Sequence, residues 1–258
     1  MTQLGDQELE RYARQIVLPD LGGVGQRRLK AASVIIIGAG GIGSAAIPAL
    51  AGAGVGRLTI VDDDVVEASN LHRQFIFRSD QLGKPKALLA AEFARALNPF
   101  VEATGLQARI DASNAAALLH GHDLVLDGSD NFATRLAVSD AATKLAIPLV
   151  SAAAAQFQAQ VGLFRGFDPG KPCYRCFVGD AFDADDCDNC ADLGVLGALT
   201  AMAGAFAALM AIQALAGIGG ALAGSLSFYQ GPSGGWRTVR VPKDPACGAC
   251  GGANAANP

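Results

Sequence analysis

The chain has 258 residues, enough to bury one large core or two small ones. Its formal net charge is −4, which argues against a nucleic-acid partner on electrostatic grounds. The opening residues MTQLGD have neither a basic start nor an apolar core. We therefore expect no signal peptide, a cytoplasmic location, and cysteines that stay reduced for metal binding or catalysis.

Short apolar runs alternate with helix-compatible segments through the first 151 residues. Strands are predicted at residues 33–37, 58–61, 101–106, 123–127 and 148–151, and helices at 42–53, 84–97 and 131–146. Pro48 is expected to kink or break the first helix. This alternation predicts an α/β fold with a Rossmann-like, doubly wound, mostly parallel sheet.

The character of the chain changes after residue 151. Residues 161–164 and 226–229 are predicted strands of a more antiparallel half, and the tail 251–258 is expected to be flexible. No charged residue occurs from 193 to 230, a stretch long enough to span a bilayer. Because it is rich in Ala and Gly, contains Gln213 and lacks a basic flank, we expect no membrane segment but a buried helix, such as one at a subunit interface.

A glycine-rich loop directly follows the first predicted strand. Gly38, Gly40 and Gly43 fit Gly-x-Gly-x-x-Gly, and Asp62 stands at the end of the next strand. Such a loop brings backbone N–H groups and a helix N-terminus to a phosphate, while the acid accepts hydrogen bonds from a ribose. The pattern alone indicates an NAD or FAD site, or a glycine turn that only lets a helix pack on the sheet.

Three further residues argue against a dinucleotide. Arg73 and Lys86 follow the strand predicted at 58–61, and Asp130 follows the one predicted at 123–127, so they can meet at one phosphate site. Cations and a carboxylate suit phosphoryl or nucleotidyl transfer with Mg²⁺, and hydride transfer needs none of them. An NAD-dependent oxidoreductase with a structural zinc is the alternative, and either cation taken singly could be a solvated surface charge.

Six cysteines form three Cys-x-x-Cys pairs. Spacing allows zinc to be held by Cys173 and Cys176 with either Cys187 and Cys190 or Cys247 and Cys250, and spacing alone slightly favours the compact first arrangement.

Several motifs, in this order, resemble the ThiF/MoeB/HesA family over about residues 8 to 250. They are RYARQI at 11–16, the glycine loop, Asp62, SNLHRQ at 69–74, GKPK at 83–86 and DGSDN at 127–131. The resemblance implies an ATP-dependent adenylyltransferase that activates the C-terminal glycine of a ubiquitin-like sulfur carrier, MoaD- or ThiS-like, in molybdopterin or thiamin biosynthesis. A catalytically silent scaffold relative and an enzyme acting on a peptide or a tRNA-linked group are the alternatives.

The family's functional residues map onto this chain by motif. The resemblance implies a single domain over residues 1–250, with a nucleotide-binding half at about 30–151 and a carrier-binding and zinc half at about 152–250. Asp130 would hold Mg²⁺, and Arg14 would reach the ATP site of the partner subunit in a homodimer. The implied ATP site comprises Gly38, Gly40, Gly41, Gly43, Asp62, Ser69, Asn70, Leu71, Arg73, Gln74, Lys86, Asp130 and Asn131.

The resemblance also divides the cysteines. It pairs the first and last Cys-x-x-Cys as the zinc site, formed by Cys173, Cys176, Cys247 and Cys250. Cys190 then matches the family's thiol position, and Cys187 has no assigned role. The acidic loop at 180–190 is expected to cross the carrier's tail. Candidate carrier contacts, each also explicable as core packing, are Phe157, Phe164, Phe177 and Phe182.

Overall fold

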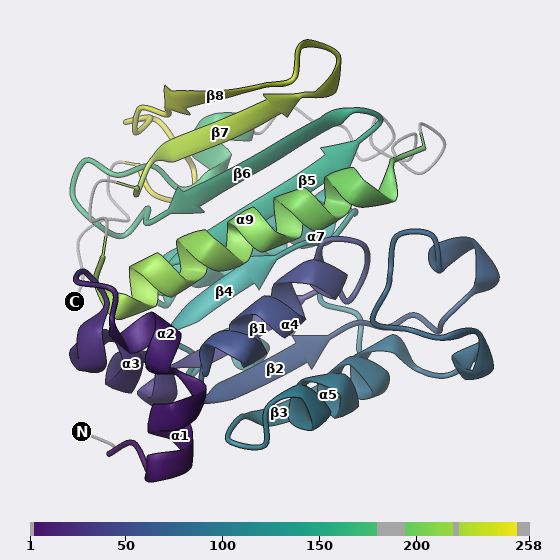
Figure 1. The fold of residues 1–258 in the computed structure, drawn as a ribbon. Coiled ribbons are helices and arrows are strands. Elements are labelled where there is room, and N and C mark those ends of the chain that lie inside the picture. The colour runs from purple at the N-terminus through teal and green to yellow at the C-terminus, as the bar shows by residue number, and fades with distance from the viewer. Residues whose placement is uncertain (1–2, 180–193, 219–221, 252–258) are drawn as a thin grey trace.

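The protein is built on one mixed eight-stranded sheet. The computed structural model describes residues 3–179, 194–218 and 222–251. The strand order is β3-β2-β1-β4-β5-β6-β7-β8 (Figure 1). The strands are β1 (Ser33–Ile37), β2 (Arg57–Val61), β3 (Glu102–Leu106), β4 (Leu124–Asp127), β5 (Leu149–Ala155), β6 (Gln158–Phe164), β7 (Ser225–Gln230) and β8 (Gly235–Arg240).

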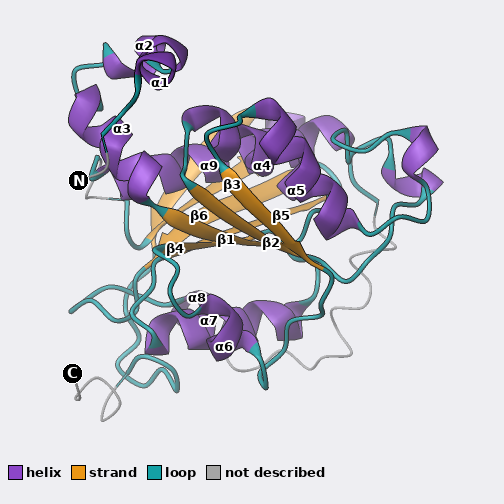
Figure 2. Ribbon diagram, turned by 90° about the horizontal axis from the view of Figure 1, so that it is seen from below, coloured by secondary structure: helices purple, strands orange, loops and turns teal. Residues whose placement is uncertain are grey.

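Helices cover both faces of this sheet. Helices α4, α5 and α9 lie on one face, and α6, α7 and α8 lie on the other (Figure 2). The described helices are α1 (Asp6–Arg11), α2 (Ala13–Ile16), α3 (Gly22–Ala31), α4 (Gly43–Ala53), α5 (Lys86–Leu97), α6 (Ala115–Leu119), α7 (Phe132–Lys144), α8 (Tyr174–Val178) and α9 (Gly197–Ala216).

The strand directions change at β5. The strands from β3 to β5 pair in parallel, and β4 leaves the sheet after Asp127, which pairs with Ser151. From β5 to β8 every pairing is antiparallel, beginning with Leu149 opposite Phe164. This confirms the predicted fold class, a doubly wound sheet that continues into an antiparallel C-terminal half.

The central strand shows why the parallel part could be recognised in the sequence. All five residues of β1 are buried, and its four apolar residues alternate between two cores on opposite sides of the sheet. Val34 and Ile36 enter the core under α4 and α9, while Ile35 and Ile37 enter the core under α6 and α7. A strand covered on both faces must be apolar throughout, and this produces the uninterrupted SVIII run.

Two helices bear on earlier expectations. α4 is continuous through Pro48, so the proline does not break it. α9 is long and apolar enough to cross a membrane by length and composition alone. It packs instead on α4, β5 and β6, and residues such as Ala203, Ala207 and Ala211 are fully buried. Leu209 on the same helix is nevertheless 48% exposed, so α9 is half-buried in the described chain and not fully buried as expected.

Candidate active site

A cleft of about 320 Å³ opens at the carboxyl ends of the parallel strands. Its walls come from the segments that follow β1, β2, β3 and β4. The strand order reverses between β1 and β4, and open α/β sheets bind ligands at such a point. The predicted site residues that line the cleft are Gly38, Gly40, Asp62, Asn70, Arg73, Gln74, Lys86, Asp130 and Asn131.

The glycines of the loop after β1 do different things. Gly38 has a φ of +89°, a conformation that side chains rarely adopt. A Cβ on Gly43 would collide with the carbonyl oxygen of Gly38, so this glycine lets α4 start directly under the loop. A Cβ on Gly40 would come no closer than 3.9 Å to another group, the Gln74 amide nitrogen. Gly40 therefore faces open space, where a phosphate can approach the backbone.

Asp62 ties the glycine loop to the end of β2. Its two carboxylate oxygens accept hydrogen bonds from the backbone N–H groups of Ala39, at 2.7 Å, and Asp64, at 2.9 Å. Burial raises the pKa of Asp62, and the two N–H donors and the nearby Lys86 act in the opposite direction. Each oxygen keeps a second lone pair that could accept a ribose hydroxyl.

Lys86 is the buried cation of the cleft. It is the first residue of α5, and its side chain is only 5% exposed. The ammonium Nζ lies 2.8 Å from Oδ2 of Asp64, whose side chain is 67% exposed. Packing thus holds one positive charge at the cleft wall, while its carboxylate partner stays in water.

Arg73 is a half-buried cation on the same rim. Its Nη1 donates to the backbone oxygen of Ser69 at 3.0 Å and lies 3.0 Å from Nε2 of His72. Asn70 is buried, and its side-chain oxygen accepts from the N–H of Glu67, which closes the turn before Arg73. Arg73 is therefore held by its own turn and can orient its remaining N–H groups toward an anion.

Gln74 is a buried amide with an unsatisfied oxygen. The residue is 3% exposed, and its Oε1 has no hydrogen-bond partner within the described part of the chain. A buried amide without a partner is costly, so a bound ligand that supplies one would be favoured. The fit of Gln74 beside open Gly40 therefore suits a polar ligand at this spot.

Asp130 and Asn131 follow β4. Asp130 is exposed and lines the cleft. Asn131 caps α7, because its side-chain oxygen accepts from the N–H of Thr134 at 2.9 Å. The structure thus gives Asn131 a role in starting a helix, in addition to its place in the cleft wall.

Some predicted site residues lie outside the cleft lining. Gly41 instead packs closely against α9, because a Cβ on this residue would lie only 2.8 Å from Oγ1 of Thr200. Leu71 packs against the main core, and Arg14 is exposed on α2. Ser69 donates from Oγ to Glu67, and Gly43 supports α4. Cys187, Cys190, Phe182 and the whole acidic loop at 180–190 lie outside the described residues, as does the tail from 252.

The sequence analysis did not single out several cleft residues. Asp64 pairs with Lys86 across 22 positions, and Glu67, Arg109, Ser129 and Thr134 also line the wall. Asp64 belongs to the run Asp62-Asp63-Asp64, which was visible as an acidic strand end. Arg109 follows β3, and its position carried no motif.

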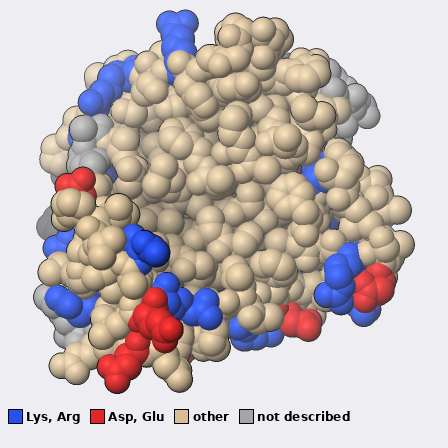
Figure 3. All heavy atoms as spheres, viewed as in Figure 1, with Lys and Arg blue, Asp and Glu red and all other residues tan. Residues whose placement is uncertain are grey.

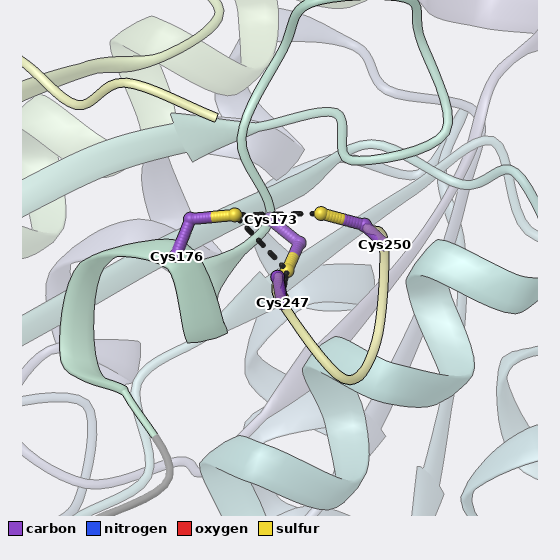
Figure 4. Close-up of side chains that lie close together, drawn as sticks. All are labelled: Cys173, Cys176, Cys247 and Cys250. Atoms are coloured by element: carbon purple, nitrogen blue, oxygen red, sulfur yellow. Dashed lines mark hydrogen bonds between the residues drawn. The ribbon is translucent and has the colours of Figure 1, made fainter. Parts of the chain in front are cut away.

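Four cysteines converge on the far side of the sheet. Cys173 and Cys176, at the start of α8, face Cys247 and Cys250 near the C-terminus (Figure 4). All four sulfurs lie within 4.8 Å of one another, and the closest contacts are 3.4 to 3.9 Å. Tetrahedral zinc, with Zn–S near 2.3 Å, places its sulfurs about 3.8 Å apart. The cluster therefore fits zinc and brings together the pairs that the resemblance implied, not the compact pairing that spacing favoured.

The protonation of these thiols also fits a metal site. Burial raises the pKa of Cys173 far above its ordinary value and raises the pKa of Cys250 to about 11. Burial acts the same way on Cys247, but backbone N–H donors together with the thiols of Cys173 and Cys250 outweigh it, so its pKa is lowered. A cysteine thiol becomes a ligand when a cation replaces its proton.

Together, the topology and the cleft define a class. A doubly wound sheet with a glycine loop at its switch point, two cations and a carboxylate is a nucleotide-binding enzyme that handles phosphates. Comparison with known proteins gives the family. The ThiF family matches residues 12–249, and the chain belongs to this family.

Two curated relatives share most of their length with this chain. A sulfur carrier protein adenylyltransferase of Thermus thermophilus is 43% identical over 248 residues, which cover 95% of this chain and 92% of the relative. A SAMP-activating enzyme E1 of Haloferax volcanii is 42% identical over 244 residues, with 95% and 89% covered. The chain is accordingly an enzyme of the adenylyltransferase type.

Solved structures share the fold. A structure of E. coli MccB with ATP matches with a TM-score of 0.83 and 22% sequence identity. The match covers 96% of this chain and 75% of that one. At this identity the likeness concerns the fold.

Proposed function

We propose that this protein uses ATP to adenylate the C-terminal glycine of a ubiquitin-like sulfur-carrier protein, MoaD- or ThiS-like. The observation that carries the proposal is the cleft, where Arg73, Lys86 and Asp130 stand around the open side of the glycine loop. An NAD-dependent oxidoreductase would leave these three charged groups without a task. The named relatives support the same chemistry, since one is a sulfur carrier protein adenylyltransferase.

The reaction is a displacement at the α-phosphorus of ATP. One carboxylate oxygen of the carrier's terminal glycine attacks phosphorus, the bond to the bridging oxygen of the β-phosphate breaks, and pyrophosphate leaves with the electron pair. The products are an acyl-adenylate on the carrier and pyrophosphate. Two anions must approach each other, so positioning and charge neutralisation supply most of the catalysis.

The cleft residues divide this work. Backbone N–H groups around Gly40 and Gly41 would meet the phosphates, and Asp62 would hold the ribose. Asn70, Arg73 and Lys86 would contact the triphosphate, where Lys86 brings a charge that solvent screens little. Asp130 would hold Mg²⁺, which when bound neutralises phosphate charge.

A homodimer would complete this site. The face shown in Figure 3 carries almost no charged side chains over α4 and α9, and neither helix contains a charged residue. Val17 and Leu18, which follow α2, are 72% and 54% exposed, and Leu209 on α9 is 48% exposed. A second copy packed there would cover these apolar groups, and Arg14 on α2 would then lie close to the partner's cleft.

The carrier would rest on the antiparallel half. Phe157, at the β5–β6 turn, is 57% exposed, and Trp236 on β8 is 42% exposed beside Phe206 and Tyr229. Exposed aromatic groups are typical anchors of protein interfaces. Phe164 is buried and Phe177 packs on Phe228, so both serve the core. Zinc would staple the C-terminal segment to α8, and Cys190 would be the thiol that meets the carrier.

The test is ATP–pyrophosphate exchange in the presence of purified MoaD-like and ThiS-like carriers. Exchange that requires one carrier with its intact terminal glycine supports the proposal and assigns molybdopterin or thiamin biosynthesis. A carrier without the terminal glycine is the matched control. ATP binding without exchange for any carrier ending in Gly-Gly would refute the proposal in favour of a silent scaffold or of an enzyme that acts on a peptide or a tRNA-linked group.

A further inference from the structure

A buried arginine stands behind the turn that carries Asp130. Arg135 lies in the first half of α7 and is only 6% exposed. Among the described residues it makes no ion pair, and the groups that accept its hydrogen bonds are all neutral oxygens. A buried charge is costly unless its hydrogen bonds are made, so an arginine here needs a reason beyond filling space.

The partners of Arg135 belong to two different elements. Nη2 donates to the backbone oxygen of Ser129, in the turn after β4, and to that of Ala152 in β5 at 2.7 Å. Nη1 donates to the hydroxyl of Ser151, also in β5, at 3.0 Å. One planar side chain therefore joins the turn to the neighbouring strand.

These contacts lie where the sheet loses a pairing. The ladder between β4 and β5 ends at Asp127 and Ser151, because β4 turns away while β5 runs on to Ala155. The oxygen of Ala152, one residue past the ladder, accepts from Arg135 instead of from a strand. The guanidinium thus continues the bonding between the two strands beyond the end of β4.

The bond to Ser129 bears directly on Asp130. The oxygen of Ser129 and the nitrogen of Asp130 belong to the same planar peptide group, so holding one fixes the other. The preceding residues of the turn are also held: Gly128 donates to Ile37 at 2.9 Å, and Ser129 donates to Oδ1 of Asp127 at 2.9 Å. Asp130 itself is exposed at the cleft and depends on this turn for its position.

We propose that Arg135 is a positioning residue for adenylation, which fixes the peptide plane of Asp130 against β5 so that the carboxylate meets the reacting phosphate in register. The inference rests on the proposed function. Lysine keeps the charge but cannot donate in two directions from a planar fork, so charge alone would not maintain the geometry.

The test compares Arg135→Lys and Arg135→Met with the wild type in carrier-dependent pyrophosphate exchange. We expect kcat to fall about 100-fold in both variants, because displacement of a catalytic group by about 1 Å has that effect. The KM for ATP should change less than about threefold, since the nucleotide contacts remain. The matched control is Arg95→Met. Arg95 also donates from a helix to the backbone oxygen of a strand residue, Ala103, but Arg95 does not line the cleft.

A double-mutant cycle separates positioning from general damage. If Arg135 acts through Asp130, Arg135→Lys combined with Asp130→Asn should be no slower than Asp130→Asn alone, within about threefold. Independent effects would multiply and overturn the proposal, as would wild-type kcat in Arg135→Lys. If Arg135→Lys does not fold, Ser151→Ala is used in its place. This variant removes one hydrogen bond of Arg135, so we expect kcat to fall about 3- to 10-fold. An unchanged kcat overturns the proposal. Absence of exchange in the wild type would overturn the proposed function as well, whereas exchange with these unexpected variant results overturns only the role of Arg135.

Discussion

Replacing Lys86 by methionine tests whether this residue serves adenylation, as proposed, or mainly the fold. Methionine fills similar space without charge, and the site is 5% exposed, so the core should accept it. The change breaks the 2.8 Å pair with Asp64, but that carboxylate is 67% exposed and remains hydrated. We therefore expect the free energy of unfolding to change by no more than about 1 kcal/mol.

The catalytic effect should be larger. A donor aimed at charge that develops in the transition state is worth about 3 kcal/mol. Since about 1.4 kcal/mol corresponds to a factor of ten, kcat/KM for ATP in the exchange reaction should fall roughly 100-fold. Lys84→Met is the matched control, because Lys84 lies two residues away, is exposed and does not line the cleft.

The outcome is read from two measurements together. Urea unfolding gives the stability, and steady-state exchange at varied ATP gives kcat/KM. A loss of less than tenfold in kcat/KM would show that Lys86 does not contact the triphosphate. A loss of more than about 3 kcal/mol in stability would show that Lys86 mainly supports the fold.

Three further predictions concern the loop, the cysteines and the N-terminal helix. Gly40→Ala should leave the free energy of unfolding unchanged, because its Cβ enters open space, and should weaken ATP binding at least about tenfold, because a phosphate would approach the backbone there. Gly43→Ala should lower the free energy of unfolding by about 1–3 kcal/mol, because its Cβ would collide with Gly38. Equal stabilities of the two variants would contradict this. Cys247→Ser should abolish the binding of one zinc per chain. It should also lower the free energy of unfolding by at least about 2 kcal/mol, which is a small part of what a structural zinc supplies. If metal analysis finds the same zinc content in the variant as in the wild type, these cysteines do not form the zinc site. Burial raises the pKa of Glu8, but the bonds from Lys30, at 2.6 Å, and Gly5 outweigh it and leave the pKa lowered. Its contribution is present above the unfolded pKa near 4.3 and is lost as the pH falls through the folded value, so the stability difference between wild type and Glu8→Gln should shrink between about pH 5 and pH 3; a difference that does not vary with pH would refute this.

The sequence was informative where burial leaves a continuous pattern. β1 was predicted with its observed bounds because both faces are buried, and α5 and α7 differ from the predicted ranges by only a few residues at their ends. β8 was missed because most of its residues are exposed, so GWRTVR shows no apolar alternation. α6 has only five residues, too few for a helical period.

The site was predictable as a set of motifs but not as a set of contacts. Motif order identified the residues around the glycine loop, yet nothing in the chain indicates that Lys86 bonds Asp64, or that Arg135 reaches three oxygens on two elements. The cysteine pairing is similar. Spacing along the chain favoured the compact pairs. It carries no information on how β7 and β8 direct the chain, and only after these strands does Cys247 come back to Cys173.

Strand β5 makes the nucleotide and C-terminal halves mechanically one piece. It is bonded to β4 on one edge and to β6 on the other, so no linker separates the two halves in the described chain. A cut after residue 151 would leave the parallel sheet with an unpaired edge strand. It would also remove α9, whose side chains complete the core over β1 and β4. The two halves therefore cannot be exchanged between relatives as independent modules, and new carrier specificity has to be built by changing side chains on an intact platform.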